Sequence, residues 1–264
     1  MSLDSDNQAE TPALLARRDP PRLLNAKTAT LIFLSFFGVQ ILCGFLVVIA
    51  SAIASPEGLH NWASEEHISQ VLKNPATLIW SYVPGGLLMV IIARKWIPNQ
   101  LQDTSPTGAA WIRGPWEAVA KGLVIGLIIG MCTQCLMIFA KHFVPHSKLS
   151  PLGQMALTPG MPQAIWFIMT VLVAPPVEEM MFRGVFYGGY RSSLGPFWAG
   201  VATTLLFVAL HFDRYTMFRT ICITAVALAT LWCRLRWRAI GPAIAVHMGY
   251  NLMVAFKVAY WSWR

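Results

Sequence analysis

Two adjacent glutamates and an arginine, Glu178, Glu179 and Arg183, lie inside an apolar stretch of the sequence. Between residues 161 and 185 they are the only charged residues. A charged side chain within an apolar segment of this length is energetically costly, and it usually faces a polar cavity or pathway. The cluster therefore indicates a functional site.

The spacing of this cluster gives the two glutamates different surroundings. If residues 177–187 are helical, Glu179 and Arg183 form an i,i+4 pair with the acid before the base, which is the favourable order. Glu178 lies about 100° around the same helix and lacks that partner. The unpaired carboxylate is then available as a general base that activates water. The alternative is a structural ion pair beside a protonated glutamate.

Further polar groups follow downstream. His211 comes four residues after Phe207, near the predicted end of an apolar segment, where the alternative is an ordinary interfacial histidine. His247 and Asn251 are also four residues apart, so on a helix they share one face. Because both side chains can donate hydrogen bonds, they indicate either a polar cavity or a hydrogen bond between helices.

The composition defines the class of protein that must position these groups. Of the 264 residues, 56% are hydrophobic and only 12% are charged, whereas a soluble domain has about 25% charged residues. The apolar residues come in blocks near the roughly 20 residues that a transmembrane helix needs. They do not alternate with polar residues as the strands of a membrane β-barrel do. The sequence predicts an all-α, polytopic transmembrane helical bundle.

The apolar blocks predict seven transmembrane helices, or eight if Pro175 and Pro176 divide the fourth block into half-helices. The blocks cover about residues 28–54, 76–93, 122–140, 162–188, 196–212, 217–232 and 239–260. Residues 1–27 are polar and are expected to form a flexible cytoplasmic tail. Residues 28–264 are expected to form one integral-membrane domain, with the polar motifs within residues 177–251.

The net charge of +8 comes from Lys and Arg residues that stand mostly at the ends of the apolar blocks. Basic residues at these positions are typical of cytoplasmic loops and of contact with anionic lipid headgroups. More of them fall on the side of the N-terminus, and residues 234–238 hold a short arginine cluster. The distribution predicts a cytoplasmic N-terminus and no binding of nucleic acid. A bacterial inner membrane is the expected location, because organelle signals are absent and the chain is of modest length; the alternative is the endoplasmic reticulum.

The ordered motifs Glu-Glu-x-x-x-Arg, Phe-x-x-x-His and His-x-x-x-Asn, each on a late apolar segment, resemble those of the CPBP family of intramembrane proteases. The family includes the CAAX prenyl endopeptidases and the bacterial Abi-type bacteriocin-processing or immunity proteins. The resemblance covers residues 177–251 at the level of motifs. It implies an endopeptidase that cleaves a peptide bond near the membrane surface, on the cytoplasmic side.

The resemblance also implies roles for the residues that match the motifs. Glu178 would activate the attacking water with the help of His211. His247 and Asn251 would donate hydrogen bonds to the tetrahedral oxyanion, and Glu179 and Arg183 would shape the site. This mechanism needs no metal and no cofactor. The expected partners are the lipid bilayer and a peptide or protein substrate, either prenylated or otherwise associated with the membrane.

Three other functions are alternatives to a metal-independent endopeptidase. One glutamate and two histidines could bind zinc with an open position, although the chain lacks His-Glu-x-x-His and the candidates come from separate segments. A non-catalytic immunity or scaffold protein would bind a peptide or a partner membrane protein. An ion or proton transporter is disfavoured because no inverted second half with matching broken segments is visible.

Overall fold

A computed structural model describes residues 24–54, 64–73, 75–96, 114–140, 163–212 and 217–262. Every element within these ranges is helical, which confirms the predicted all-α class. The elements are α2 (Ala26–Ala54), α3 (Glu65–Lys73), α4 (Pro75–Trp96), α5 (Trp116–Ala140), α7 (Gln163–Phe167), η2 (Ile168–Val173), α8 (Ala174–Glu179), η3 (Met180–Phe186), α9 (Tyr187–Leu210), α10 (Met217–Trp237) and α11 (Gly241–Ser262). Residues 1–23 of the predicted tail lie outside the described residues.

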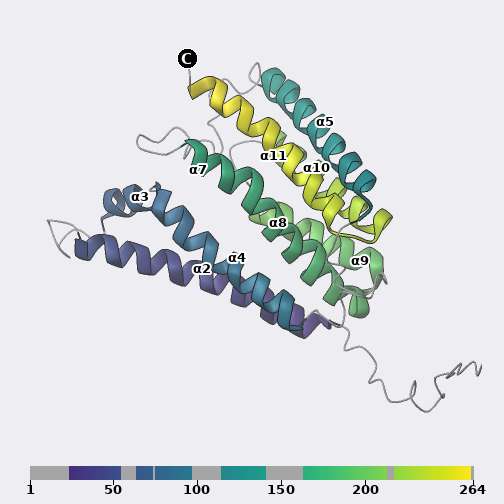
Figure 1. Cartoon of the computed structure of the whole chain (residues 1–264), viewed down its shortest axis with the longest axis horizontal. Coiled ribbons are helices and arrows are strands. Elements are labelled where there is room, and N and C mark those ends of the chain that lie inside the picture. The colour runs from purple at the N-terminus through teal and green to yellow at the C-terminus, as the bar shows by residue number, and fades with distance from the viewer. Residues whose placement is uncertain are drawn as a thin grey trace, which may run out of the picture.

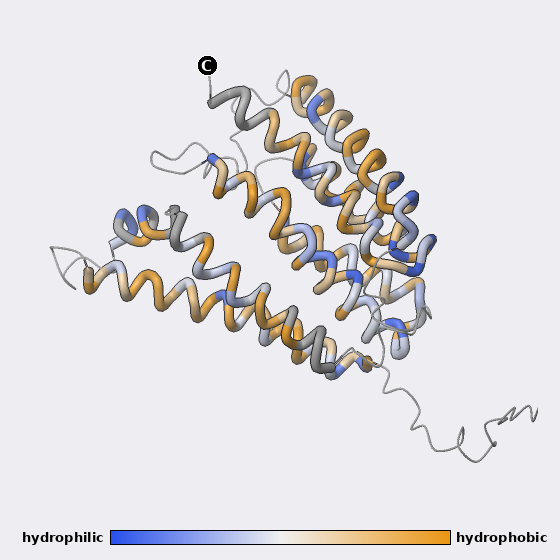
Figure 2. Tube along the Cα trace, viewed as in Figure 1, coloured by the Kyte–Doolittle hydropathy of each residue, from blue (hydrophilic) through white to orange (hydrophobic). Residues whose placement is uncertain are grey.

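The described helices form a helical membrane protein. Four stretches are long and apolar enough to cross a bilayer, namely Ala26–Ala54, Trp116–Ala140, Gln163–Leu210 and Met217–Trp237. Large apolar side chains are exposed along them, for example Ile41 at 72% and Leu205 at 64%, as expected for surfaces that face lipid. Figure 2 shows hydrophobic residues along most of the helical length. The helices α4 and α11 are not among these four stretches, so the transmembrane spans predicted there remain predictions.

The fourth and fifth predicted spans lie in the stretch Gln163–Leu210, which consists of two helical parts that meet at a kink. The kink is at Gly195, where φ is 76° and ψ is 166°, between the two predicted spans and not at the paired prolines. A positive φ favours glycine, and the following Pro196 disfavours the α conformation at residue 195. Pro175 and Pro176 instead begin α8, directly after the π-helical segment η2. The prolines therefore change the helical register without dividing the span.

The helices are arranged in three groups (Figure 1). α2 and α4 lie side by side on one side of the molecule, and α5, α10 and α11 lie on the other. The stretch from α7 through α9 runs between these groups and contacts both α2 and α11. This middle stretch carries Glu178 and Glu179, so both groups of helices can contribute to the site.

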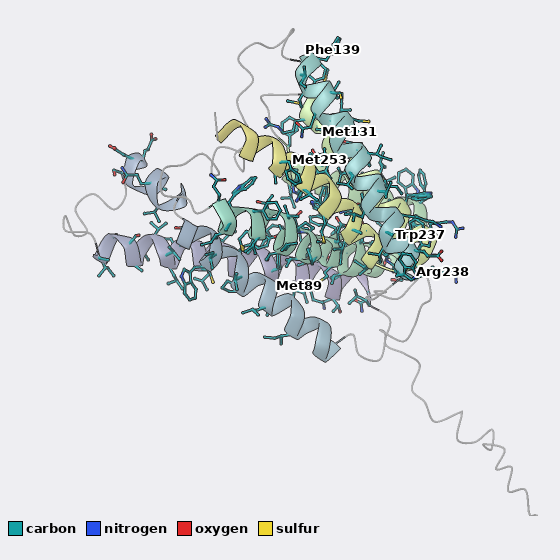
Figure 3. All side chains as sticks on the ribbon, turned by 45° about the horizontal axis from the view of Figure 1, so that its top comes forward. Met89, Met131, Phe139, Trp237, Arg238 and Met253 are labelled. Carbon is teal, nitrogen blue, oxygen red and sulfur yellow. The ribbon has the colours of Figure 1, made fainter. Side chains whose placement is uncertain are left out.

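α11 packs very closely on α5 through small residues. Gly122, Gly126 and Gly130 are buried at successive turns of α5, and a Cβ atom at Gly126 would overlap the carbonyl oxygen of Val246 on α11. Small residues of this kind let the backbones of membrane helices approach each other. Figure 3 shows Met253 of α11 beside α5. The contact fixes the position of the helix that carries His247 and Asn251.

We expect Gly126→Ala to lower the melting temperature of the protein and its activity together. The added methyl group meets backbone rather than a flexible side chain, and overpacking of this kind costs about 1–3 kcal/mol. The matched control is Gly38→Ala in α2, where an added Cβ meets nothing within 4 Å. Thermal unfolding in detergent measures both variants. Equal melting temperatures for the two variants would contradict the role of this contact.

Candidate active site

The site begins at a change of helical register. α8 is a short α-helical segment that ends at Glu179, and π-helical segments precede and follow it. The N–H of Ala174 donates to the carbonyl of Met169, five residues back, and neither Pro175 nor Pro176 has an N–H to offer. π-Helical turns occur frequently at functional sites. The segment α8, between the two π-helical segments, places both glutamates between the two outer groups of helices.

Glu179 is the centre of a fully buried charge network. Its Oε1 lies 3.3 Å from Nη1 of Arg183, and the side chains of both residues are 0% exposed. The same oxygen lies 2.9 Å from Nδ1 of His247. Nη2 of Arg183 donates to the carbonyl of Ala227 at 2.9 Å, and its guanidinium stands 4.4 Å from the ring centroid of Phe207. The predicted i,i+4 ion pair is confirmed, and it also reaches α10 and α11.

Glu178 has separate surroundings, as predicted. Its Oε2 lies 3.5 Å from Nε2 of His211 and 3.9 Å from Nε2 of His247. Its Oε1 accepts a hydrogen bond of 3.1 Å from the hydroxyl of Tyr82 on α4. The Glu178 side chain is 19% exposed, so it is less enclosed than Glu179. The structure thus brings together four of the predicted site residues, Glu178, Glu179, His211 and His247, and joins Arg183 to them through Glu179.

The ring of His211 is oriented by Phe207, one turn earlier in α9. Nδ1 of His211 lies 2.9 Å from the carbonyl oxygen of Phe207, and the two rings stack at 4.3 Å. A carbonyl only accepts, so Nδ1 carries a proton and Nε2 of the neutral ring is an acceptor. Nε2 and the carboxylate of Glu178 then face each other as two acceptors. The pair is consequently suited to share one proton.

Asn251 lies on α11 with His247, but its hydrogen bond goes elsewhere. Its Nδ2 donates to the carbonyl oxygen of Thr170 in η2 at 2.8 Å. That carbonyl lacks its helical donor, because Ala174 donates to Met169 and the next residue is Pro175. The side-chain amide therefore replaces a missing backbone bond, which orients Asn251 while its second N–H stays available as a donor.

Two residues of this region were not predicted from the sequence as parts of a site. Tyr82 contacts Glu178 across 96 positions of sequence, and no motif or spacing marks it. Arg234, interpreted from the sequence as part of a basic loop, belongs to the last turn of α10 and is 1% exposed. Its Nε donates to the carbonyl of Arg183 at 3.3 Å. No local pattern in the sequence indicates this burial, because it depends on how the helices pack.

Within the described ranges, no group of three or more His, Cys, Asp and Glu side chains has an arrangement that could hold a metal ion. Glu178, His211 and His247 nevertheless converge on one point. Any activity measurement should therefore be made both with and without a metal chelator.

Comparisons with known proteins concern the C-terminal half of the chain. Residues 160–253 match the family described as type II CAAX prenyl endopeptidase Rce1-like. Over 93 residues the chain is 33% identical to the UPF0177 protein YbdI of Lactococcus lactis subsp. lactis (strain IL1403). The aligned segment makes up 34% of this chain and 48% of that protein. The chain thus spans about half the length of this curated relative. No solved structure matches the chain. The resemblance expected from the motifs is confirmed over the segment that holds all of them.

Proposed function

From the similarity of residues 160–253 to CAAX prenyl endopeptidases, we propose that this protein is an intramembrane endopeptidase that uses a glutamate-activated water. The observation that carries the proposal is the convergence of Glu178 Oε2 with Nε2 of His211 and Nε2 of His247, at 3.5 and 3.9 Å. These separations are too long for strong direct hydrogen bonds, and the attacking water would bind beside these three atoms, within hydrogen-bond distance of them.

In the proposed reaction, Glu178 Oε2 accepts a proton from this water, and the water oxygen attacks the carbonyl carbon of the scissile peptide. His211 helps to hold the water and shares the proton with Glu178 through Nε2. The proton then passes to the departing amine nitrogen when the C–N bond breaks. General acid–base catalysis of this type contributes about 10²- to 10⁴-fold in rate. No covalent intermediate forms with the protein.

The oxyanion of the tetrahedral intermediate would be bound by His247 and Asn251. In its doubly protonated form, the ring of His247 would donate from Nδ1 to the Glu179 carboxylate, 2.9 Å away, and from Nε2 to the oxyanion. Asn251 would add its second N–H. Donors of this kind are worth about 3 kcal/mol each in the transition state. Arg183 balances the charge of Glu179 and keeps the pair in place.

We place the substrate in or at the bilayer, with the scissile bond near the cytoplasmic surface and the N-terminus of the protein in the cytoplasm of a bacterial cell. Trp237 and Arg238 mark the turn between α10 and α11 in Figure 3, and Figure 1 shows this turn at the end of the bundle where α2 begins. The basic residues Arg236 and Arg238 at this turn favour the cytoplasmic side. The substrate is a peptide or membrane-associated protein, prenylated or unmodified.

The test is cleavage of a mixed library of prenylated and unmodified membrane-proximal peptides by the purified protein in detergent. New termini are detected by mass spectrometry, with and without a zinc chelator, and Glu178→Gln serves as the inactive control. We expect cleavage by the wild type alone, unchanged by chelator, and the cleaved peptides then reveal the substrate class.

Other outcomes would contradict this mechanism in different ways. Cleavage lost on chelation would favour a zinc protease built on the same residues. Absence of cleavage by a folded wild type would favour the non-catalytic alternative, an immunity or scaffold protein that binds its partner in the membrane.

A further inference from the structure

A tyrosine outside the matched segment contacts the proposed general base. The hydroxyl of Tyr82, on α4, donates to Oε1 of Glu178 at 3.1 Å, whereas the family similarity begins only at residue 160. We infer that Tyr82 is a positioning residue that sets the orientation of the Glu178 carboxylate for catalysis. The catalytic part of this inference rests on the proposed function, and the contact itself does not.

The packing of α4 fixes the position of this hydroxyl. Tyr82, Gly86 and Met89 lie on one face of α4, at the spacing i, i+4 and i+7. A Cβ atom at Gly86 would stand 3.2 Å from Cγ2 of Val177, the neighbour of Glu178. Met89, labelled in Figure 3, is 1% exposed and belongs to the same core cluster as Val177. The turns that follow Tyr82 are thus held against the helix that carries Glu178.

The contact gives the two carboxylate oxygens of Glu178 different tasks. Oε1 is occupied by the hydroxyl of Tyr82, and Oε2 is directed to Nε2 of His211 and Nε2 of His247. Without the hydroxyl, the carboxylate loses this donor and can turn about its last side-chain bond. Oε2 would then leave the position between the histidines for part of the time, and fewer encounters with substrate would be productive.

The chain offers a matched control for this hydroxyl. The hydroxyl of Tyr190 on α9 bonds to Oγ1 of Thr30 on α2 at 2.7 Å. Like the Tyr82 bond, it joins the α2–α4 pair to the middle stretch, but its partner is a neutral hydroxyl. Tyr190→Phe removes the same atom and the same type of interhelical bond without touching Glu178.

The kinetic test compares wild type, Tyr82→Phe and Tyr190→Phe on a peptide that the wild type cleaves. For Tyr82→Phe we expect kcat to fall about ten- to a hundredfold, the range for losing a hydrogen bond to a charged group, with KM changed less than about twofold, as for an interaction that acts in the transition state. Tyr190→Phe should keep the wild-type kcat. Equal losses in both variants, or an unchanged kcat in Tyr82→Phe, would overturn the inference.

An infrared measurement tests the contact without any substrate. The carboxyl vibration of Glu178 is assigned as the band lost in Glu178→Gln. We expect this band to shift in Tyr82→Phe and to stay in place in Tyr190→Phe. An unmoved band in Tyr82→Phe overturns the inference whether or not the protein cleaves peptides. A shifted band in a protein that cleaves nothing upholds Tyr82 as the residue that orients Glu178 and overturns the proposed function instead.

Discussion

Glu178→Gln is expected to lower the rate of peptide cleavage by about 10²- to 10⁴-fold, the contribution of a general base. Glutamine has the shape of glutamate and still offers an oxygen to the hydroxyl of Tyr82. It has no carboxylate to take the proton of the attacking water. Because the substitution neutralises a side chain that is partly exposed, the melting temperature should stay close to that of the wild type. The cleavage rate and thermal unfolding are measured on the same preparation.

The control for this prediction is Glu117→Gln in the first turn of α5. It makes the same chemical change on an exposed side chain remote in sequence from the motifs, and it should leave the rate unchanged. A Glu178→Gln variant that is folded and cleaves as fast as Glu117→Gln would exclude Glu178 as the base. A variant that has lost its structure would show instead that the carboxylate stabilises the fold.

Glu179→Gln is expected to act on stability, with a loss of about 3–5 kcal/mol, the usual effect of removing one partner from a buried ion pair. The guanidinium of Arg183 would remain fully buried without its carboxylate, and Nδ1 of His247 would lose the charged acceptor at 2.9 Å. Arg183→Met should be comparably destabilising, because it leaves the carboxylate of Glu179 buried without its cationic partner. The stability of both variants is compared with that of Glu178→Gln by thermal or denaturant unfolding in detergent.

The double variant Glu179→Gln/Arg183→Met separates this explanation from a simple loss of packing. When both charges are removed, neither remains buried and uncompensated, so the double variant should be more stable than the sum of the single losses predicts. Strictly additive losses would mean that the two residues act independently. Single variants as stable as the wild type would contradict the buried ion pair itself.

The sequence was sufficient to predict the features that depend on neighbouring residues. The low share of charged residues and the long apolar blocks predicted a helical membrane protein, which the described helices confirm. The pairing of Glu179 with Arg183 followed from their spacing, because residues four apart on a helix lie one above the other whatever surrounds them. The match of residues 160–253 falls on the segment that carries the three motifs.

The bend at Gly195 falls between the predicted fourth and fifth spans, residues 162–188 and 196–212. The sequence left open whether Pro175 and Pro176 also divide the fourth span, and here they follow a π-helical turn while the helical path continues through them. A proline needs only that its missing N–H and its ring be accommodated. Here the lost donor is replaced in part by the side chain of Asn251, which reaches Thr170 from α11. The compensating group comes from another helix, so inspection of residues 163–186 alone does not reveal it.

The composition and the apolar blocks of the sequence thus determined the class of protein. The spacing of residues along one helix determined the buried ion pair, since the rise and turn of a helix are the same in every protein. Only the tertiary structure decided that Oε2 of Glu178 faces His211 and His247, that Tyr82 holds its other oxygen, and that Arg234 is buried. These contacts join residues on different helices. They depend on which helices pack together and how closely, as Gly126 shows where α5 meets α11, and no local periodicity in the sequence carries that information.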